Sequence, residues 1–232
     1  MKLLLLCILI FFPALSKAQN NLVWEHLWQF SASLAKQEYS SVWLQKIEKD
    51  AIKISNKCSK FKNEASFLRY LFHFLHRKYL KTYEKNATWH HLFQKGTYNC
   101  VSGVALFAYF LEKSGLSYQI YETENHVFLC VPTQEGTNIL IETTAFFTNG
   151  LQIFQANSLL VSDFTNLSAI SFENLIGIFY YNEAVKAYEK ENFVASLTYA
   201  NKAYRFYPCD RNKKIFALSK ERLEKQVAFI SK

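Results

Sequence analysis

An almost wholly apolar run occupies residues 101–111, interrupted by one serine and one glycine. A run of this kind has no polar face, so it predicts a helix that is buried on all sides in the centre of the fold. Residues 112–115 follow and have the composition of a helix end, with glycine at the stop. We therefore expect a buried helix that begins at Asn99 or Cys100.

Three β-rich segments follow the apolar run, at residues 117–121, 126–131 and 139–143. The stretch between the last two, residues 132–138, contains Gly136 and polar residues, which is typical of a hairpin turn. A buried helix followed by a strand and a hairpin predicts an α+β fold, in which helices pack on an antiparallel sheet.

Residues 20–95 have the apolar spacing of helices and predict a helical N-terminal part. The clearest pattern is a long amphipathic helix over residues 63–83, whose charged residues lie outside the apolar stripe. Two shorter stripes predict earlier helices. The three stripes are Leu68, Leu71, Leu75 and Tyr79; Trp24, Leu27, Phe30 and Leu34; and Val42, Leu44, Ile47 and Ile52.

The first residues have the pattern of an export signal. A lysine at position 2 precedes an unbroken apolar run at residues 3–12, and Ser16 and Ala18 are small residues where a signal peptidase reads the chain. We predict a signal peptide over residues 1–18 and an exported, periplasmic or secreted protein; the alternative is an uncleaved membrane anchor. The run is shorter than the ~20 residues of a membrane-spanning helix, and no later run is long enough, so we expect no stable membrane insertion.

The formal charge of +8 is spread among many acidic residues, without a block of Lys or Arg. A basic stripe is the pattern that binds nucleic acid, so we expect no nucleic-acid partner. Hydrophobic residues make up 50% of the chain, which is enough for a packed core and excludes a disordered protein.

Of the five cysteines, one lies in the predicted signal peptide. Cys58 and Cys209 could pair in an oxidising compartment, but the sequence does not establish their connectivity. The four histidines at positions 73, 76, 90 and 91 form no CxxC or HExxH pattern, so we interpret them as surface or interface residues. We expect no metal site and no cofactor.

From about Gly177 the chain returns to helix, and we predict a C-terminal helical hairpin over residues 177–232 beside a main domain over residues 19–176. The spacing is similar to that of a tetratricopeptide repeat, although Glu191 stands where a turn glycine is usual; the alternative is a generic helical hairpin. A lone repeat cannot bury its own apolar face, so we expect it to pack on the main domain. The repeat-like positions are Tyr180, Ala184, Phe193, Ser196, Ala203 and Pro208.

Cys100 stands at the predicted N-terminus of the buried helix, where free backbone N–H groups and the helix dipole favour a thiolate. His126 opens the second β-rich segment, and Glu142 ends the third. Because side chains alternate along a strand, the hairpin puts His126 and Glu142 on one face, directly opposite or about one rung apart. The carboxylate can then orient the imidazole while the ring serves the thiol, which is the arrangement of covalent catalysis.

Three segments carry these residues: 96–107, 125–129 and 140–144. Their order resembles the transglutaminase-like superfamily, whose domains have a papain-like arrangement, and the residues upstream look like those of exported bacterial members. The resemblance covers roughly residues 66–147. It implies Cys100 as the nucleophile, His126 as the general base and Glu142 as the acid. The family more often has Asp at the acid position, where this chain has Glu142 followed by two threonines.

The resemblance implies an exported cysteine hydrolase or acyltransferase, which acts on amide bonds of a peptide or protein through a thioester on Cys100. The alternative is a catalytically inactive scaffold of the same fold, whose C-terminal helices bind a peptide or protein partner. Rapid, pH-dependent reaction of Cys100 with a thiol probe would favour the enzyme, and reaction no faster than that of a free thiol would favour the scaffold.

Overall fold

The computed structural model describes residues 24–25, 27–29, 41–144, 150–155 and 167–230 of the chain. The chain divides into two compact units, Met1–Ser40 and Ser41–Lys232. In the first unit the described residues are helical, as the stripe that starts at Trp24 predicts. The predicted signal peptide and the rest of this stripe, Phe30 and Leu34, lie outside the described residues.

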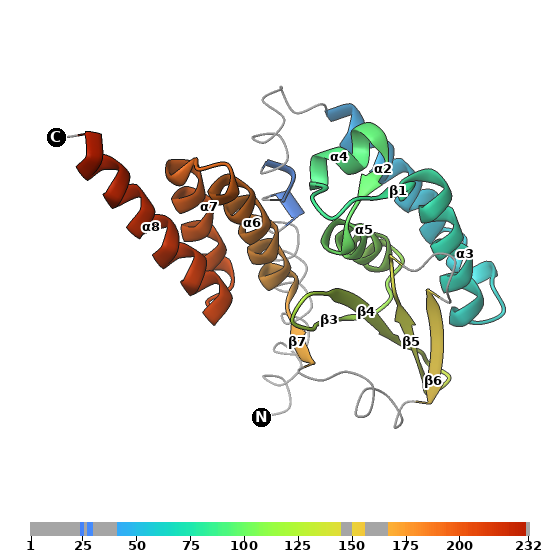
Figure 1. The fold of residues 1–232 in the computed structure, drawn as a ribbon. Coiled ribbons are helices and arrows are strands. Elements are labelled where there is room, and N and C mark those ends of the chain that lie inside the picture. The colour runs from blue at the N-terminus through green and yellow to red at the C-terminus, as the bar shows by residue number, and fades with distance from the viewer. Residues whose placement is uncertain (1–23, 26, 30–40, 145–149, 156–166, 231–232) are drawn as a thin grey trace, which may run out of the picture. The chain divides into compact units, whose positions relative to one another are not determined.

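The second unit combines helices with an antiparallel sheet, which confirms the α+β prediction (Figure 1). The order of the five strands across the sheet is β6-β5-β4-β3-β7, and every neighbouring pair is antiparallel. The sequence patterns predicted only the three inner strands; β7 spans three residues, too few for a period, and β6 was not recognised from the sequence. The strands are β3 (Gln119–Glu122), β4 (Val127–Pro132), β5 (Thr137–Ile141), β6 (Leu151–Gln155) and β7 (Ser168–Ile170).

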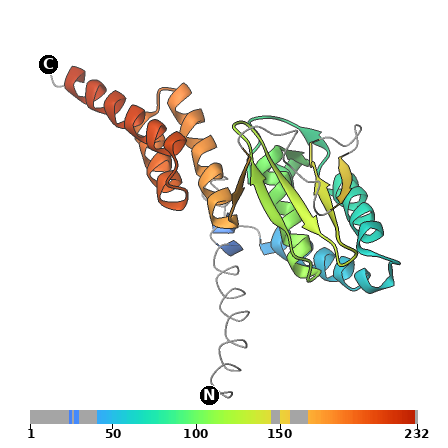
Figure 2. The ribbon, with the colours of Figure 1, turned by 90° about the horizontal axis from the view of Figure 1, so that it is seen from below.

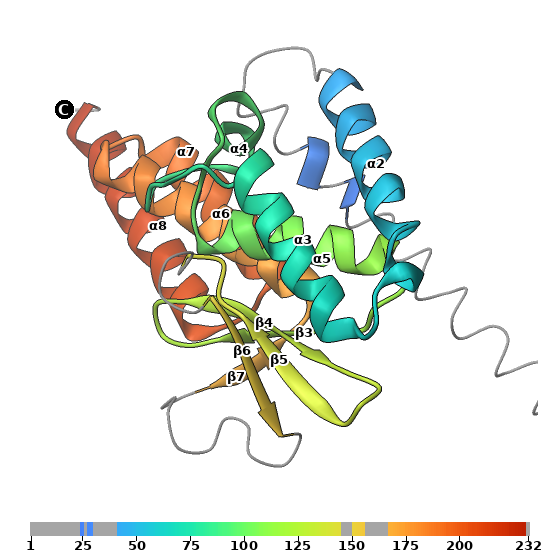
Figure 3. The same ribbon diagram turned by 90° about the vertical axis from the view of Figure 1, so that its right-hand side faces the viewer.

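The apolar run forms helix α5 (Cys100–Lys113), in which every residue from 101 to 111 is buried. Gly115 follows the helix with a positive φ of 72°, which confirms the predicted helix end. The helix packs against β4 and lies behind the strands when the sheet is viewed from below (Figure 2). Three further helices lie on the same side of the sheet as α5 (Figure 3): α2 (Ser41–Ser55), α3 (Glu64–Lys78) and α4 (Trp89–Lys95).

Helix α3 is shorter than the helix predicted over residues 63–83, because it ends at Lys78. The next two N–H groups both donate to the carbonyl of Leu75, and the chain then leaves the helix. It forms β1 (Thr82–Tyr83), which pairs in parallel with β2 (Thr97–Tyr98). No glycine or proline lies at this helix end, and the apolar spacing continues beyond Lys78. The sequence therefore predicted a longer helix than the structure has.

The helix predicted from the stripe at residues 42–52 is present, but the stripe is only partly its buried face: Ile47 is buried and two other members are exposed. Val42 and Ile52 are 65% and 51% exposed, whereas Ile47, Ala51 and Ile54 are buried. The predicted residues recur at intervals of two, three and five, which spreads them around the helix. The buried residues recur at intervals of four and three, and therefore share one face.

Three helices, and not two, make up the C-terminal part, and the first begins earlier than predicted. They are α6 (Phe172–Glu189), α7 (Phe193–Phe206) and α8 (Asp210–Ile230). Ala184, Ala200 and Ile215, one from each helix, form a small apolar core of their own. The segment also contacts the sheet, since the buried Glu122 of β3 accepts a hydrogen bond of 2.8 Å from the Tyr207 hydroxyl and forms an ion pair of 2.7 Å with Arg211.

The turn between α6 and α7 contains Glu191 with a φ of 58°. This left-handed backbone conformation is strained for a residue that has a Cβ atom. We expect Glu191→Gly to raise the free energy of unfolding by about 0.5–1 kcal/mol, because glycine adopts this conformation without strain. Lys190→Gly is the control, since Lys190 has a φ of −89°. Urea denaturation measures both, and a Glu191→Gly variant no more stable than Lys190→Gly would contradict the strain.

Within the described part of the chain, no helix is long and apolar enough to span a membrane. The four cysteines of that part, including Cys58 and Cys209, are free thiols. Cys130 is buried in β4, opposite Leu140, and burial raises the pKa of its thiol to about 11.

Candidate active site

Cys100 is the first residue of α5, and Asn99 before it is the N-cap. The Asn99 side chain accepts a hydrogen bond of 2.9 Å from the Ser102 N–H, and the Ser102 hydroxyl accepts one of 2.9 Å from the Asn99 N–H. The Asn99 carbonyl accepts from Gly103 N–H at 2.9 Å. This capping box does not use the N–H groups of Cys100 and Val101, which are the first two of the helix.

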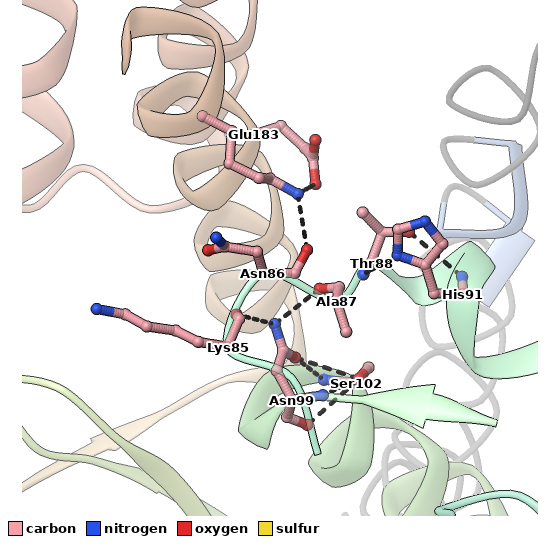
Figure 4. Close-up of polar contacts among 9 residues, drawn as sticks. Lys85, Asn86, Ala87, Thr88, His91, Asn99, Ser102 and Glu183 are labelled. Carbon is pink, nitrogen blue, oxygen red and sulfur yellow. Dashed lines mark hydrogen bonds and ion pairs between the residues drawn. The ribbon is translucent and has the colours of Figure 1, made fainter. Parts of the chain in front are cut away.

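Asn99 also fixes the loop that precedes α4. Its side-chain amide donates to the carbonyl of Ala87 at 2.9 Å and to that of Lys85 at 3.3 Å (Figure 4). Asn99 is 3% exposed, so these bonds are shielded from water. A cap-type residue three positions before a serine is the sequence signal for the capping box, but no sequence pattern indicated the bonds from Asn99 to this loop.

Helix α6 also contacts this loop. Lys186 of α6 donates to the carbonyl of Asn86 at 3.4 Å and forms an ion pair with Glu183. The residue directly before Cys100 therefore bonds a loop that α6 also contacts.

His126 lies immediately before β4, in a turn closed by a hydrogen bond of 2.8 Å from the Thr123 N–H to its carbonyl. Its Nε2 atom contacts the Glu142 carboxylate, and its ring lies near enough to the Cys100 side chain for that side chain to raise the pKa of the ring. Leu129 pairs with Ile141 in the sheet, so Glu142 lies one rung from His126, within the range that the hairpin pattern predicted. The structure thus brings Cys100, His126 and Glu142 together.

Glu142 directly follows β5 and is held at three points. Its N–H donates to the Gly150 carbonyl at 2.8 Å. One carboxylate oxygen contacts His126, and the other accepts from the N–H and the hydroxyl of Thr144 at 2.9 and 2.7 Å. Burial raises the pKa of Glu142, but the bonds from His126 and Thr144 outweigh it, and the pKa lies below its ordinary value. The role of Thr144 was not predicted from the sequence.

The charge of His126 follows from its two partners. Burial lowers the pKa of its ring, but the hydrogen bonds to Cys100 and Glu142 oppose burial more strongly and raise the pKa to about 10. The ring is therefore an imidazolium at neutral pH. The His126 side chain is 31% exposed and that of Glu142 is 19% exposed, so solvent reaches both.

Two tyrosines flank this group through the short β1–β2 pair. Tyr83 pairs with Tyr98, and their ring centroids are 5.9 Å apart. Tyr83 is 49% exposed, and its pKa is raised by burial and by its electrostatic interactions with Cys100 and Glu142. An accessible phenol therefore lies near the cysteine. The sequence patterns missed it because each of these strands has two residues.

Helix α5 approaches the residue after Glu142 very closely at Gly103. A Cβ at Gly103 would lie 2.6 Å from the Thr143 hydroxyl oxygen and 2.9 Å from the Thr143 Cβ. Thr143 is fully buried, so it has no free space to move into. The glycine thus lets α5 lie against the turn that carries the carboxylate.

We expect Gly103→Ala to lower the free energy of unfolding by about 1–3 kcal/mol, because the added methyl group must displace Thr143. Adding Thr143→Ala removes the hydroxyl it meets and should recover part of the loss. Urea denaturation of the single and double variants measures this. Without the close contact, Gly103→Ala would stabilise the helix by about 1 kcal/mol, so a gain in stability would contradict the prediction.

No three His, Cys, Asp or Glu residues within the described ranges are grouped to hold a metal ion. His90 and His91 lie on α4, where His91 completes the capping box with Thr88 (Figure 4). His76 is buried in α3 and not at the surface.

No protein-family model, no curated protein and no solved structure matches this chain.

Proposed function

We propose that this chain is an exported cysteine hydrolase or acyltransferase of transglutaminase-like type, which acts on amide bonds through a thioester on Cys100. The position of His126, which contacts both Cys100 and Glu142, carries the proposal. An imidazolium that bonds a thiol favours its thiolate, and a carboxylate that bonds the imidazolium stabilises that charge.

In the first half of the reaction, the Cys100 sulfur attacks the carbonyl carbon of the amide, and a C–S bond forms. The negative charge moves to the carbonyl oxygen, where the N–H groups of Cys100 and Val101 are the available donors. The His126 imidazolium then gives its proton to the amide nitrogen. The C–N bond breaks, the amine leaves, and the acyl group stays on Cys100 as a thioester.

In the second half, the neutral His126 ring takes a proton from water or from an acceptor amine as that nucleophile attacks the thioester. The C–S bond breaks, and the product is a carboxylic acid or a new amide. Glu142 keeps its negative charge throughout and orients the ring. The site residues are partly exposed, which fits a peptide or protein substrate better than a small molecule enclosed on all sides.

The test is the rate at which iodoacetamide alkylates Cys100 in the purified wild-type protein between pH 5 and 9, with the modified residue identified by peptide mass mapping. We expect the rate at pH 6 to exceed that of a free cysteine by about 10–100-fold, because an ordinary thiol is less than ~1% ionised there. A rate no faster than that of a free thiol would reject the enzyme and leave the scaffold. A screen of peptides with and without an acceptor amine then separates hydrolysis from transfer.

A further inference from the structure

His76 lies in the last turn of α3 and is 5% exposed, yet both of its ring nitrogens face backbone carbonyls. Nδ1 is 3.0 Å from the carbonyl oxygen of Phe72, one turn earlier in the same helix. Nε2 is 2.9 Å from the carbonyl oxygen of Thr143. The second contact joins α3 to a residue far away in the sequence, which directly follows Glu142.

Thr143 lies between the two residues whose contacts define the position of the carboxylate. Glu142 precedes it and bonds His126, while Thr144 follows it and bonds the other oxygen of the Glu142 carboxylate. The Thr143 side chain is fully buried against Gly103. The backbone carbonyl of Thr143 is held by His76. One hydrogen bond from α3 therefore restrains the backbone between Glu142 and Thr144.

We propose that His76 is a positioning residue, which donates from Nε2 to the Thr143 carbonyl and thereby holds the Glu142 carboxylate against His126. The kinetic part of this proposal rests on the proposed function. The geometric part does not, since it concerns the bond between His126 and Glu142 whether or not Cys100 is a nucleophile.

The surroundings of His76 decide which nitrogen carries the proton. The ring packs among Phe72, Tyr98 and Phe107, and His73 is the other titratable group on its helix that acts on it. Burial lowers the pKa of His76, and the two carbonyls only partly oppose this. The neutral ring has one N–H. The Phe72 carbonyl lies four residues before His76 in a helix, where it accepts a backbone bond, so the Thr143 carbonyl has the greater need of the side-chain donor.

Two amide substitutions separate the two nitrogens. The side-chain nitrogen of glutamine reaches the position of His Nε2, whereas the shorter asparagine reaches only that of Nδ1. We expect His76→Gln to keep the bond to Thr143 and His76→Asn to lose it. His73→Asn, at an exposed position of the same helix, is the matched control for asparagine in α3.

The main measurement is the NMR titration of His126 in protein labelled with ¹³C-histidine, because it reports the contact with Glu142 without any activity. We expect the His126 pKa to stay near 10 in wild type, His76→Gln and His73→Asn, and to fall by about one unit or more in His76→Asn. The alkylation rate of Cys100 at pH 6 should fall by about tenfold in His76→Asn and recover in His76→Gln.

Equal behaviour of the Gln and Asn variants would overturn the proposal, whether both resemble wild type, both lose the raised His126 pKa or both unfold, because Nε2 would then have no special role. Slow alkylation of the wild-type protein would reject the proposed function alone. The His126 titration would still decide the role of His76 in that case.

Discussion

Cys100→Ala is expected to abolish covalent labelling at this position and all turnover, with no loss of helix content by circular dichroism. His126→Ala should lower the alkylation rate of Cys100 at pH 6 by about 10–100-fold, because the sulfur loses the imidazolium that favours its ionised form and reacts as an ordinary thiol. The measurement is the second-order rate constant for iodoacetamide at pH 6 in each variant. Unchanged labelling in His126→Ala would show that the ring does not act on the sulfur.

Two other cysteines provide internal controls in the same experiment. Burial raises the pKa of the Cys130 thiol to about 11, and burial together with the charge of Glu64 raises that of Cys58. Both should react slowly at pH 6, and their rates should not change between wild type and His126→Ala. Faster labelling of Cys58 and Cys130 in His126→Ala would indicate a global loss of structure and not the loss of one contact.

Glu142→Gln is expected to reduce turnover by about 10–10³-fold while the fold persists. In the Ser-His-Asp template, the change from acid to amide costs about 10⁴, and a cysteine enzyme that starts from an ion pair should lose less. The amide oxygen of glutamine would accept from Thr144, as the Glu142 carboxylate does. The amide nitrogen would then face the His126 ring, where it presents a donor to a donor.

The pH dependence of stability tests the same contact. The folded-state pKa of His126, about 10, lies above its ordinary value. Its contribution to the free energy of unfolding is therefore complete below pH ~6.5 and is lost as the pH rises through about 10. Glu142 has the opposite sign, because its folded-state pKa is lowered. Its contribution to the free energy of unfolding is complete above its ordinary pKa and is lost as the pH falls through the folded-state pKa. Urea midpoints measured from pH 6 to 10 should fall more steeply in wild type than in Glu142→Gln. Equal slopes, or wild-type turnover in Glu142→Gln, would show that Glu142 has another role.

The sequence predicted the local elements of the site well, because each depends on a short pattern. The apolar run gave the start of α5 at Cys100 and its end near Gly115. The alternation of side chains along the hairpin placed His126 and Glu142 on one face, one rung apart.

The contacts that hold the site residues in place were not predicted from the sequence, because no short pattern encodes them. The bond from His76 to the Thr143 carbonyl depends on how α3 packs, and no local spacing encodes it. Tyr83 reaches the site through a strand of two residues, which is too short for any periodicity. For the same reason β7 was missed, and the stripe predicted for α2 included Val42 and Ile52, which are exposed.

The order of the strands has a consequence for synthesis of the chain. The ribosome makes β3 before β4, β5 and β6, but one edge of β3 pairs only with Ser168–Ile170, the last strand to emerge. Until then the N–H and C=O groups along that edge have no partner strand, and such an edge can add a strand from another nascent chain. The final third of the polypeptide therefore protects the first strand of the sheet, and a product that terminates before Ser168 would be prone to aggregate through β3.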